Sequence, residues 1–369
     1  MTATTLFSPL ALGPLGLSHR VVMAPLTRMR ATTPGHVPNA MNAEYYSQRA
    51  SRGGLIIAEA SQVLPSGQGA PCTPGCHTEE QAAGWKLVTD AIHARGGYVY
   101  LQLWHVGRIS HASHQPGGAA PVSASAIAAE GMATTAQFKR EPYPVPRALT
   151  TEEIPGIVEG YAQAARLAKS AGFDGVEIHS ANGYLLEQFM QSRSNQRTDA
   201  YGGSIANRCR LALEVTEAVA GVWGADRVGI RLSPFGVANG SGEADPMPLY
   251  THIVSELDKL GLAYLHLIEP RSSGAGQADV DHKDVPSACE LFRPRWRGVL
   301  MTAGNFKADS ASDTVARGHA DAIAFGRFFI SNPDLPERIR RGAEFAPYNR
   351  ATFYSRGPQG YTDYPMLAA

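Results

Sequence analysis

Cysteine is scarce in this sequence of 369 residues, charge of one sign is not in excess, and long hydrophobic runs are missing. Only four cysteines occur, which is too few for a disulfide scaffold in a chain of this length, so we interpret Cys72, Cys76, Cys209 and Cys289 as reduced thiols. Lys plus Arg and Asp plus Glu each number 33, and this balance gives no indication of nucleic acid as a partner. A small neutral or amphipathic substrate agrees better with the composition.

Targeting and membrane segments are missing too. Residues Met1–Arg20 contain no basic segment followed by a sustained apolar stretch, and no apolar run approaches the length of a membrane span. We therefore expect a cytoplasmic protein without membrane contact. Residues Cys72–His77 hold two cysteines and a histidine, but no second Cys/His pair follows at ligand spacing, so we expect no metal site.

Short apolar runs rich in β-branched residues recur along the chain, each followed by an amphipathic stretch of helical period. This alternation is typical of a parallel sheet covered by helices. The clearest predicted helix is Ile154–Ser170, with acidic residues just before it and a glycine stop at Gly172. The eight candidate strands are Val21–Ala24, Leu55–Glu59, Tyr98–Leu103, Gly175–His179, Val228–Leu232, Tyr264–Ile268, Val299–Thr302 and Ala322–Phe325.

Strand–helix units without a linker or a break in composition favour a closed barrel over an open, doubly wound sheet. No Gly-x-Gly-x-x-Gly motif opens a helix after the early strands, which weakens the open-sheet alternative. We predict an α/β fold, a (β/α)8 TIM barrel that forms a single domain over residues 1–369.

Two segments do not belong to a minimal barrel. Residues 4–19, with prolines and glycines between apolar residues, predict an N-terminal hairpin that plugs the barrel bottom. Residues 105–150 form an excursion after the third strand that is longer than an ordinary loop. Because this position lies on the catalytic face of a barrel, we expect a lid or capping insertion, with an inert insertion as the alternative.

The ends of the last two strands predict a phosphate site. In barrels of this kind, the loops after strands seven and eight commonly bind phosphate through backbone N–H groups. Gly304 and Gly326 allow a close approach of the backbone, and Arg327 offers a bidentate partner. Ordinary turn chemistry is the alternative for each motif taken alone.

Three polar residues at other strand ends are suited to a heteroaromatic ring such as an isoalloxazine. Thr27, Gln102 and Arg231 supply a hydroxyl, an amide and a permanent cation, which together hydrogen-bond such a ring and offset negative charge on it. Each has a structural alternative, as a turn cap, a partner of the backbone or a member of an ion pair.

The end of the fourth strand carries a candidate catalytic cluster. His179 and Asn182 are three residues apart, so both side chains can face one way and donate to a single substrate oxygen. Tyr184 follows with a phenol suited to protonating carbon. A structural histidine and a core tyrosine are the alternatives, and the grouping of the three favours the functional interpretation.

Several segments, taken together, closely resemble the Old Yellow Enzyme family of FMN-dependent ene-reductases, in particular its bacterial branch. The resemblance covers nearly the whole chain. The segments that carry it are Ala24–Arg28, Glu44–Ala50, Gln102–His105, Gly107–Ser110, Gln115–Gly118, Asn195–Asp199, Tyr201–Ser204, Ala324–Arg327 and Gly360–Pro365.

The resemblance implies a tightly bound, non-covalent FMN and a cycle in which NADPH, or NADH, supplies hydride and an unsaturated substrate receives it. The substrates would be α,β-unsaturated carbonyl or nitro compounds, or nitrate esters. His179, Asn182, Tyr184 and Thr27 would be catalytic, with Tyr184 as proton donor and Trp104 and Tyr354 shaping the pocket. The residues implied at the cofactor are Pro25, Leu26, Thr27, Ala60, Gln102, Arg231, Ala303, Gly304, Asn305, Phe325, Gly326 and Arg327.

Rival interpretations keep the barrel but change the chemistry. A 2-hydroxy acid oxidase would use His179 as base and Arg231 for a carboxylate, which leaves Tyr184 without a role. A sensor or carrier would bind a phosphorylated ligand without turnover. Residues 66–76 and 129–146 depart from the family pattern, which bears on substrate range, and the neutral composition agrees with a monomer or a homodimer.

Overall fold

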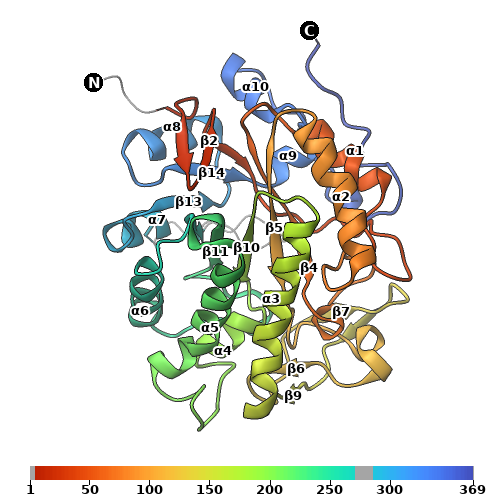
Figure 1. The fold of residues 1–369 in the computed structure, drawn as a ribbon, viewed down its shortest axis with the longest axis vertical. Coiled ribbons are helices and arrows are strands. Elements are labelled where there is room, and N and C mark those ends of the chain that lie inside the picture. The colour runs from red at the N-terminus through yellow and green to blue at the C-terminus, as the bar shows by residue number, and fades with distance from the viewer. Residues whose placement is uncertain (1–4, 271–285, 369) are drawn as a thin grey trace.

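Eight parallel strands close into a barrel in the computed structural model, which describes residues 5–270 and 286–368 (Figure 1). The strands follow one another in chain order around the barrel, and the last pairs with the first. Their bounds are β3 Val21–Met23, β4 Leu55–Gln62, β5 Tyr98–Trp104, β10 Gly175–Ser180, β11 Val228–Leu232, β12 Tyr264–Ile268, β13 Val299–Ala303 and β14 Ala322–Phe325. The predicted (β/α)8 barrel is confirmed.

The strands are nearly continuous apolar runs because the barrel interior covers one face and the helices cover the other. All eight residues of β4 are buried. The predicted helix α3, Ile154–Ser170, is confirmed, and the chain leaves it through Gly172, whose φ is 85°. The other α-helices among the described residues are α1 Ala40–Arg49, α2 Glu79–His93, α4 Leu185–Met190, α5 Ile205–Trp223, α6 Pro246–Asp258, α7 Ala288–Phe292, α8 Ala308–Ala316, α9 Arg327–Ser331 and α10 Leu335–Arg341.

The predicted N-terminal hairpin is present as β1 Leu10–Leu12 and β2 Leu15–Leu17. Its leucines pack in one buried cluster with inward side chains of the barrel such as Tyr100 and Met301, so the hairpin closes one end. At the hairpin turn, a Cβ on Gly13 would lie 1.9 Å from a backbone oxygen of Asp226, which only glycine avoids.

The excursion after β5 contains two small sheets at the other end of the barrel (Figure 1). Strands β6 Val122–Ser123 and β9 Arg147–Ala148 pair in parallel, and β7 Met132–Thr134 and β8 Arg140–Pro142 form an antiparallel hairpin. The short parallel pair brings the two ends of the excursion together, and the hairpin extends beyond them.

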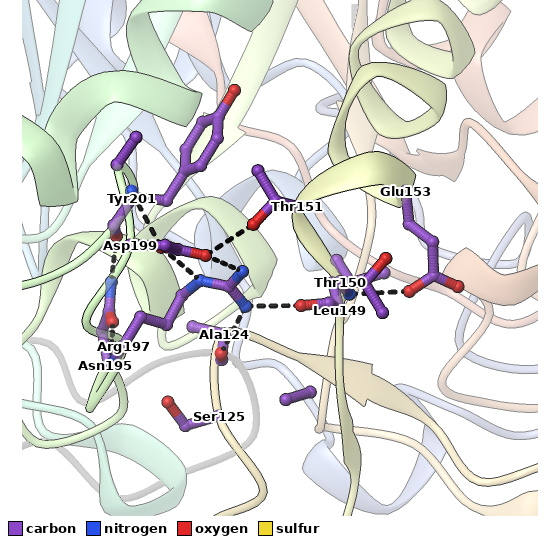
Figure 2. A network of polar contacts seen from close by, with 12 residues as sticks. Ala124, Ser125, Leu149, Thr150, Thr151, Glu153, Asn195, Arg197, Asp199 and Tyr201 are labelled. Carbon is purple, nitrogen blue, oxygen red and sulfur yellow. Dashed lines mark hydrogen bonds and ion pairs between the residues drawn. The ribbon is translucent and has the colours of Figure 1, made fainter.

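Arg197, whose side chain is only 8% exposed, ties the base of this excursion to the barrel, as Figure 2 shows. Arg197 donates to the carbonyl oxygens of Ala124 and Leu149, at 3.0 Å and 2.5 Å, on the two sides of the excursion. The Asp199 carboxylate accepts from Nε of the Arg197 guanidinium at 3.1 Å and from the Thr151 hydroxyl at 2.8 Å. This network explains structurally why the Asn195–Asp199 segment carries polar side chains.

Three buried arginines fasten the C-terminal segment across the barrel. Arg28 donates to the carbonyls of Phe353 and Gly360, at 3.2 Å and 2.6 Å, and Arg30 donates to Phe353 at 3.0 Å. The Arg49 guanidinium donates to the carbonyl oxygen of Tyr361 at 3.2 Å. Because Arg28 follows directly on Thr27, these bonds connect the C-terminal segment to a predicted site loop.

In residues 5–270 and 286–368, no helix has the length and apolar character to cross a membrane, and no three potential metal ligands of the Cys, His, Asp and Glu types come together. All four cysteines are buried and unpaired.

Candidate active site

A cavity of about 360 Å³ lies at the carboxyl ends of the barrel strands. Each strand contributes to its lining, either directly or through the residues that follow it. Every residue that the sequence placed in the site lines this cavity, namely Pro25, Leu26, Thr27, Ala60, Gln102, Trp104, His179, Asn182, Tyr184, Arg231, Ala303, Gly304, Asn305, Phe325, Gly326, Arg327 and Tyr354. The structure thus brings the predicted residues together; their individual roles stay predictions.

The cavity has a positive lining. Among the described residues around it there is no aspartate or glutamate, whereas Arg140, Arg231 and Arg327 all take part. Such a site is suited to an anionic or electron-accepting ligand.

Arg231 lies opposite His179 in the ladder between β10 and β11. Its side chain is buried, and its Nε has no hydrogen-bond partner among the described groups. Burial lowers the pKa of Arg231, while Glu177 opposes this shift. A buried guanidinium with a free donor is expected to hydrogen-bond a ligand, because an unsatisfied buried donor is costly.

A buried polar cluster supports this arginine from inside the barrel. Gln102 donates its amide to Glu177 at 2.7 Å, and His266 lies 2.8 Å from the other carboxylate oxygen. Burial opposes ionisation of Glu177, but His266, Arg231 and Gln102 outweigh it and lower the pKa. The carboxylate therefore fixes the Gln102 amide and balances the charge of Arg231.

His179 is a neutral imidazole. Its pKa lies well below the usual value because of burial first, and then because of Arg231 and His266. The Nδ1 atom is buried without a partner in the described structure. A neutral ring donates one N–H without transferring a proton, which is what polarisation of a substrate oxygen requires.

Asn182 lies in a turn between β10 and α4 and has a φ of 58°, in the left-handed region. Its backbone N–H donates to the Ser233 hydroxyl at 2.8 Å. Asn182 lines the cavity together with His179, although the chain between them forms a turn and not the helical turn that the three-residue spacing assumed.

Tyr184 packs edge-on against two cavity side chains. Its ring centroid lies 4.9 Å from that of Trp104 and 4.9 Å from that of His179. Burial, with smaller contributions from Tyr143 and Tyr354, raises the pKa of Tyr184. The phenol therefore keeps its proton at neutral pH and is available as a donor.

The part of the cavity after β13 and β14 is lined by the glycines Gly304 and Gly326. A Cβ on Gly304, whose φ is +142°, would lie 2.8 Å from Cβ of Glu269. Gly326 lies just before α9, and a Cβ there would meet Leu26 at 3.4 Å. Together with Arg327, this backbone is suited to the phosphate of a bound cofactor.

Several residues of the site were missed at the level of sequence. Met132, Thr134, Arg140 and Tyr143 reach the cavity from the excursion, and Tyr348 reaches it from the C-terminal segment. The expected lid over residues 105–150 includes the first four as a segment, but no local signal singled out these residues or Tyr348. Glu177 was also missed, although its position two residues before His179 on one strand indicates the same face.

The chain is similar to known proteins over nearly its whole length. The model of the NADH:flavin oxidoreductase / NADH oxidase family matches residues 5–345. A 12-oxophytodienoate reductase 1 of Oryza sativa subsp. japonica is 47% identical over 368 residues, covering 99% of this chain and 94% of the relative. A 12-oxophytodienoate reductase 2 of Arabidopsis thaliana is 46% identical, and the match covers 98% of this chain and 96% of the relative.

Solved structures agree with these sequence relatives. The structure of morphinone reductase has a TM-score of 0.93 and 48% identity and covers 100% of this chain and 98% of that one. Morphinone reductase in complex with tetrahydroNAD has a TM-score of 0.91 and 49% identity, and the match covers 99% of this chain and 98% of that chain.

Proposed function

Since the chain belongs to the NADH:flavin oxidoreductase / NADH oxidase family, and within it to the Old Yellow Enzymes, we propose the following roles for its residues. The protein is an FMN-dependent oxidoreductase that reduces activated carbon–carbon double bonds of α,β-unsaturated carbonyl compounds. 12-Oxophytodienoate and morphinone, after which the relatives are named, are ketones. The observation that carries the assignment is one cavity that joins neutral His179, Asn182 and Tyr184 with buried Arg231.

The residues at the cavity fit FMN. The unpartnered Nε of Arg231 and the fixed amide of Gln102 are suited to the polar edge of the isoalloxazine, with Thr27 and Ala60 lining the cavity beside them. Gly304, Asn305, Gly326 and Arg327 would hold the phosphate end. When bound, FMN would supply hydride transfer from a nicotinamide coenzyme to the β-carbon of the substrate.

His179 and Asn182 bind the substrate carbonyl or nitro oxygen. Both donate neutral N–H groups, so they stabilise negative charge as it develops on that oxygen without protonating it. Because the described cavity lining contains no carboxylate, nothing there opposes this charge.

Tyr184 delivers the proton to the α-carbon. Its raised pKa keeps the phenol protonated through the neutral range, and its contacts with Trp104 and His179 fix the ring beside the oxygen donors. The proton and the hydride would then come from different groups, and by this proposal hydrogen is added trans across the double bond.

The hydride donor is NADPH rather than NADH, by this proposal. Arg140 on β8 lines the cavity from the excursion and donates to Thr134 at 3.0 Å, so its guanidinium is held at the rim. A cation there favours a coenzyme with an additional phosphate.

In the same proposal, residues 105–150 act as a lid of a single FMN-binding domain.

Anaerobic stopped-flow spectroscopy tests the function. Flavin absorbance should bleach on addition of NADPH and recover on addition of 2-cyclohexenone. Protein that purifies folded without flavin would contradict the cofactor, and reduction without enone-driven recovery would contradict the oxidising substrate.

A further inference from the structure

The turn that carries the oxygen donor has an unusual backbone. Asn182 and Gly183 are consecutive residues in the left-handed region, with φ values of 58° and 76°. A non-glycine residue rarely adopts this conformation without support from its surroundings. The turn leads directly into Tyr184 and α4, so its conformation sets the positions of both Asn182 and Tyr184.

One carboxylate holds this turn. Gly183 donates its backbone N–H to Oε2 of Glu187 at 2.5 Å, and the Ser233 hydroxyl donates to Oε1 at 2.6 Å. Ser233 in turn accepts the backbone N–H of Asn182 at 2.8 Å. Glu187 thus holds Gly183 directly and Asn182 through one hydroxyl.

The peptide is also fixed from its other side. The Gln188 amide donates to the carbonyl of Gly183 at 2.7 Å. A Cβ on Gly183 would lie 3.0 Å from the carbonyl oxygen of Ala238, so the turn has little room to move.

The full set of hydrogen bonds to Glu187 favours its ionised form. Tyr250 on α6 donates to Oε1 at 2.6 Å, so three donors converge on one carboxyl group, which accepts from all three only when it is deprotonated. Burial raises the pKa of Glu187 to about 7, against the hydrogen bonds from Ser233 and Tyr250.

The surroundings of Glu187 hold no balancing cation. In the described chain, no Lys, Arg or His forms an ion pair with it. The Cys209 thiol on α5 contributes to the raised pKa of Tyr250 and carries no positive charge. The nearby Arg208 is paired with Glu243 at 2.9 Å, so its charge is already balanced.

We propose that Glu187 is a positioning residue for substrate binding, whose ionised carboxylate sets the Asn182–Tyr184 turn in its competent form. This inference rests on the proposed function. When Glu187 is protonated, one of its three donors loses its acceptor and the turn relaxes. Enone binding therefore weakens as the pH falls through the titration of this carboxylate.

The test compares wild type with Glu187→Gln. The dissociation constant of 2-cyclohexenone is measured on the oxidised holoenzyme from flavin absorbance changes, between about pH 5.5 and pH 8.5. Wild type should show weaker binding at low pH. Glu187→Gln should bind about 10-fold more weakly at high pH and lose the pH dependence, because an amide cannot accept from all three donors.

Two milder variants retain the carboxylate. Ser233→Ala and Tyr250→Phe each remove one donor that favours the ionised form, so the pH dependence should move to higher pH. Glu243→Gln is the matched control, since it removes a carboxylate that touches Arg208 and Ser192 and not the turn. It should retain the wild-type profile.

The outcomes are distinct. A pH dependence that persists unchanged in Glu187→Gln, or unchanged profiles in both milder variants, would overturn the positioning role. If Glu187→Gln fails to fold, the pH profiles of Ser233→Ala and Tyr250→Phe test the positioning role. A wild-type enzyme that is reduced by NADPH but neither binds nor is reoxidised by any enone would instead overturn the proposed function.

Discussion

His179 and Arg231 face each other across neighbouring barrel strands, and each retains a buried nitrogen without a partner in the described structure. The relationship has an electrostatic consequence, because the arginine adds to burial in lowering the pKa of His179. A cation next to the histidine keeps the ring neutral, and a neutral ring is a donor that does not compete with Tyr184 for delivery of the proton.

Replacement of Tyr184 separates the two half-reactions. We expect Tyr184→Phe to be reduced by NADPH at nearly the wild-type rate and to be reoxidised by 2-cyclohexenone about 100-fold more slowly or worse, since only the second step needs a proton on carbon. Rapid-mixing measurements of each half-reaction provide the check. Equal losses in both steps would argue against the proton-donor role.

Arg140 should govern the choice of coenzyme. We expect Arg140→Ala to lower the ratio of kcat/KM for NADPH over that for NADH by about 10-fold, since a charge-assisted hydrogen bond to phosphate contributes roughly 1–2 kcal/mol at a partly exposed site. Arg147→Ala is the control, because Arg147 lies in the same excursion and pairs with Glu153 away from the cavity. An unchanged ratio in Arg140→Ala would assign selectivity to another residue.

Gly304 should be required for binding of the cofactor. An alanine there places its Cβ 2.8 Å from Glu269 in a backbone conformation with φ of +142°. We expect Gly304→Ala to bind FMN at least about 10-fold more weakly, measured by fluorescence quenching as FMN is added to deflavinated protein. Gly318→Ala has a positive φ but an open surrounding, so it should lose stability without losing FMN affinity.

Buried histidines should make the fold sensitive to acid. Burial, with a contribution from Arg340, lowers the pKa of His19 from 6.5 to about 4, and burial lowers that of His105 to about 3. Below pH 6.5 the unfolded chain therefore binds more protons than the folded protein. The free energy of unfolding is highest above that pH and decreases as the pH falls towards 4.

The magnitude follows from the same shift. Between pH 7 and pH 5, His19 alone should remove about 2 kcal/mol of unfolding free energy. Urea unfolding at both pH values measures the loss, and His19→Gln should reduce it. His252→Gln on α6 is the control, and an identical loss in His19→Gln and wild type would contradict the assignment.

Much of the fold was predictable because its signals are local. The barrel strands are short apolar runs, and the catalytic face of a barrel lies at their carboxyl ends, so residues such as Gln102, His179 and Arg231 could be assigned to one site from their positions after or near the ends of strands. The N-terminal hairpin and helix Ile154–Ser170 were likewise recognisable from local periodicity and glycine stops.

The parts that the sequence did not reveal depend on partners far apart in the chain. Ser233 meets Asn182 across 51 positions, and Arg28 meets Gly360 across 332. Arg140 reaches the cavity only because the excursion folds back over it. Local periodicity determined which segments become strands and helices, whereas closure of the barrel decided which polar groups share a dry interior, and burial there decided which of them are charged.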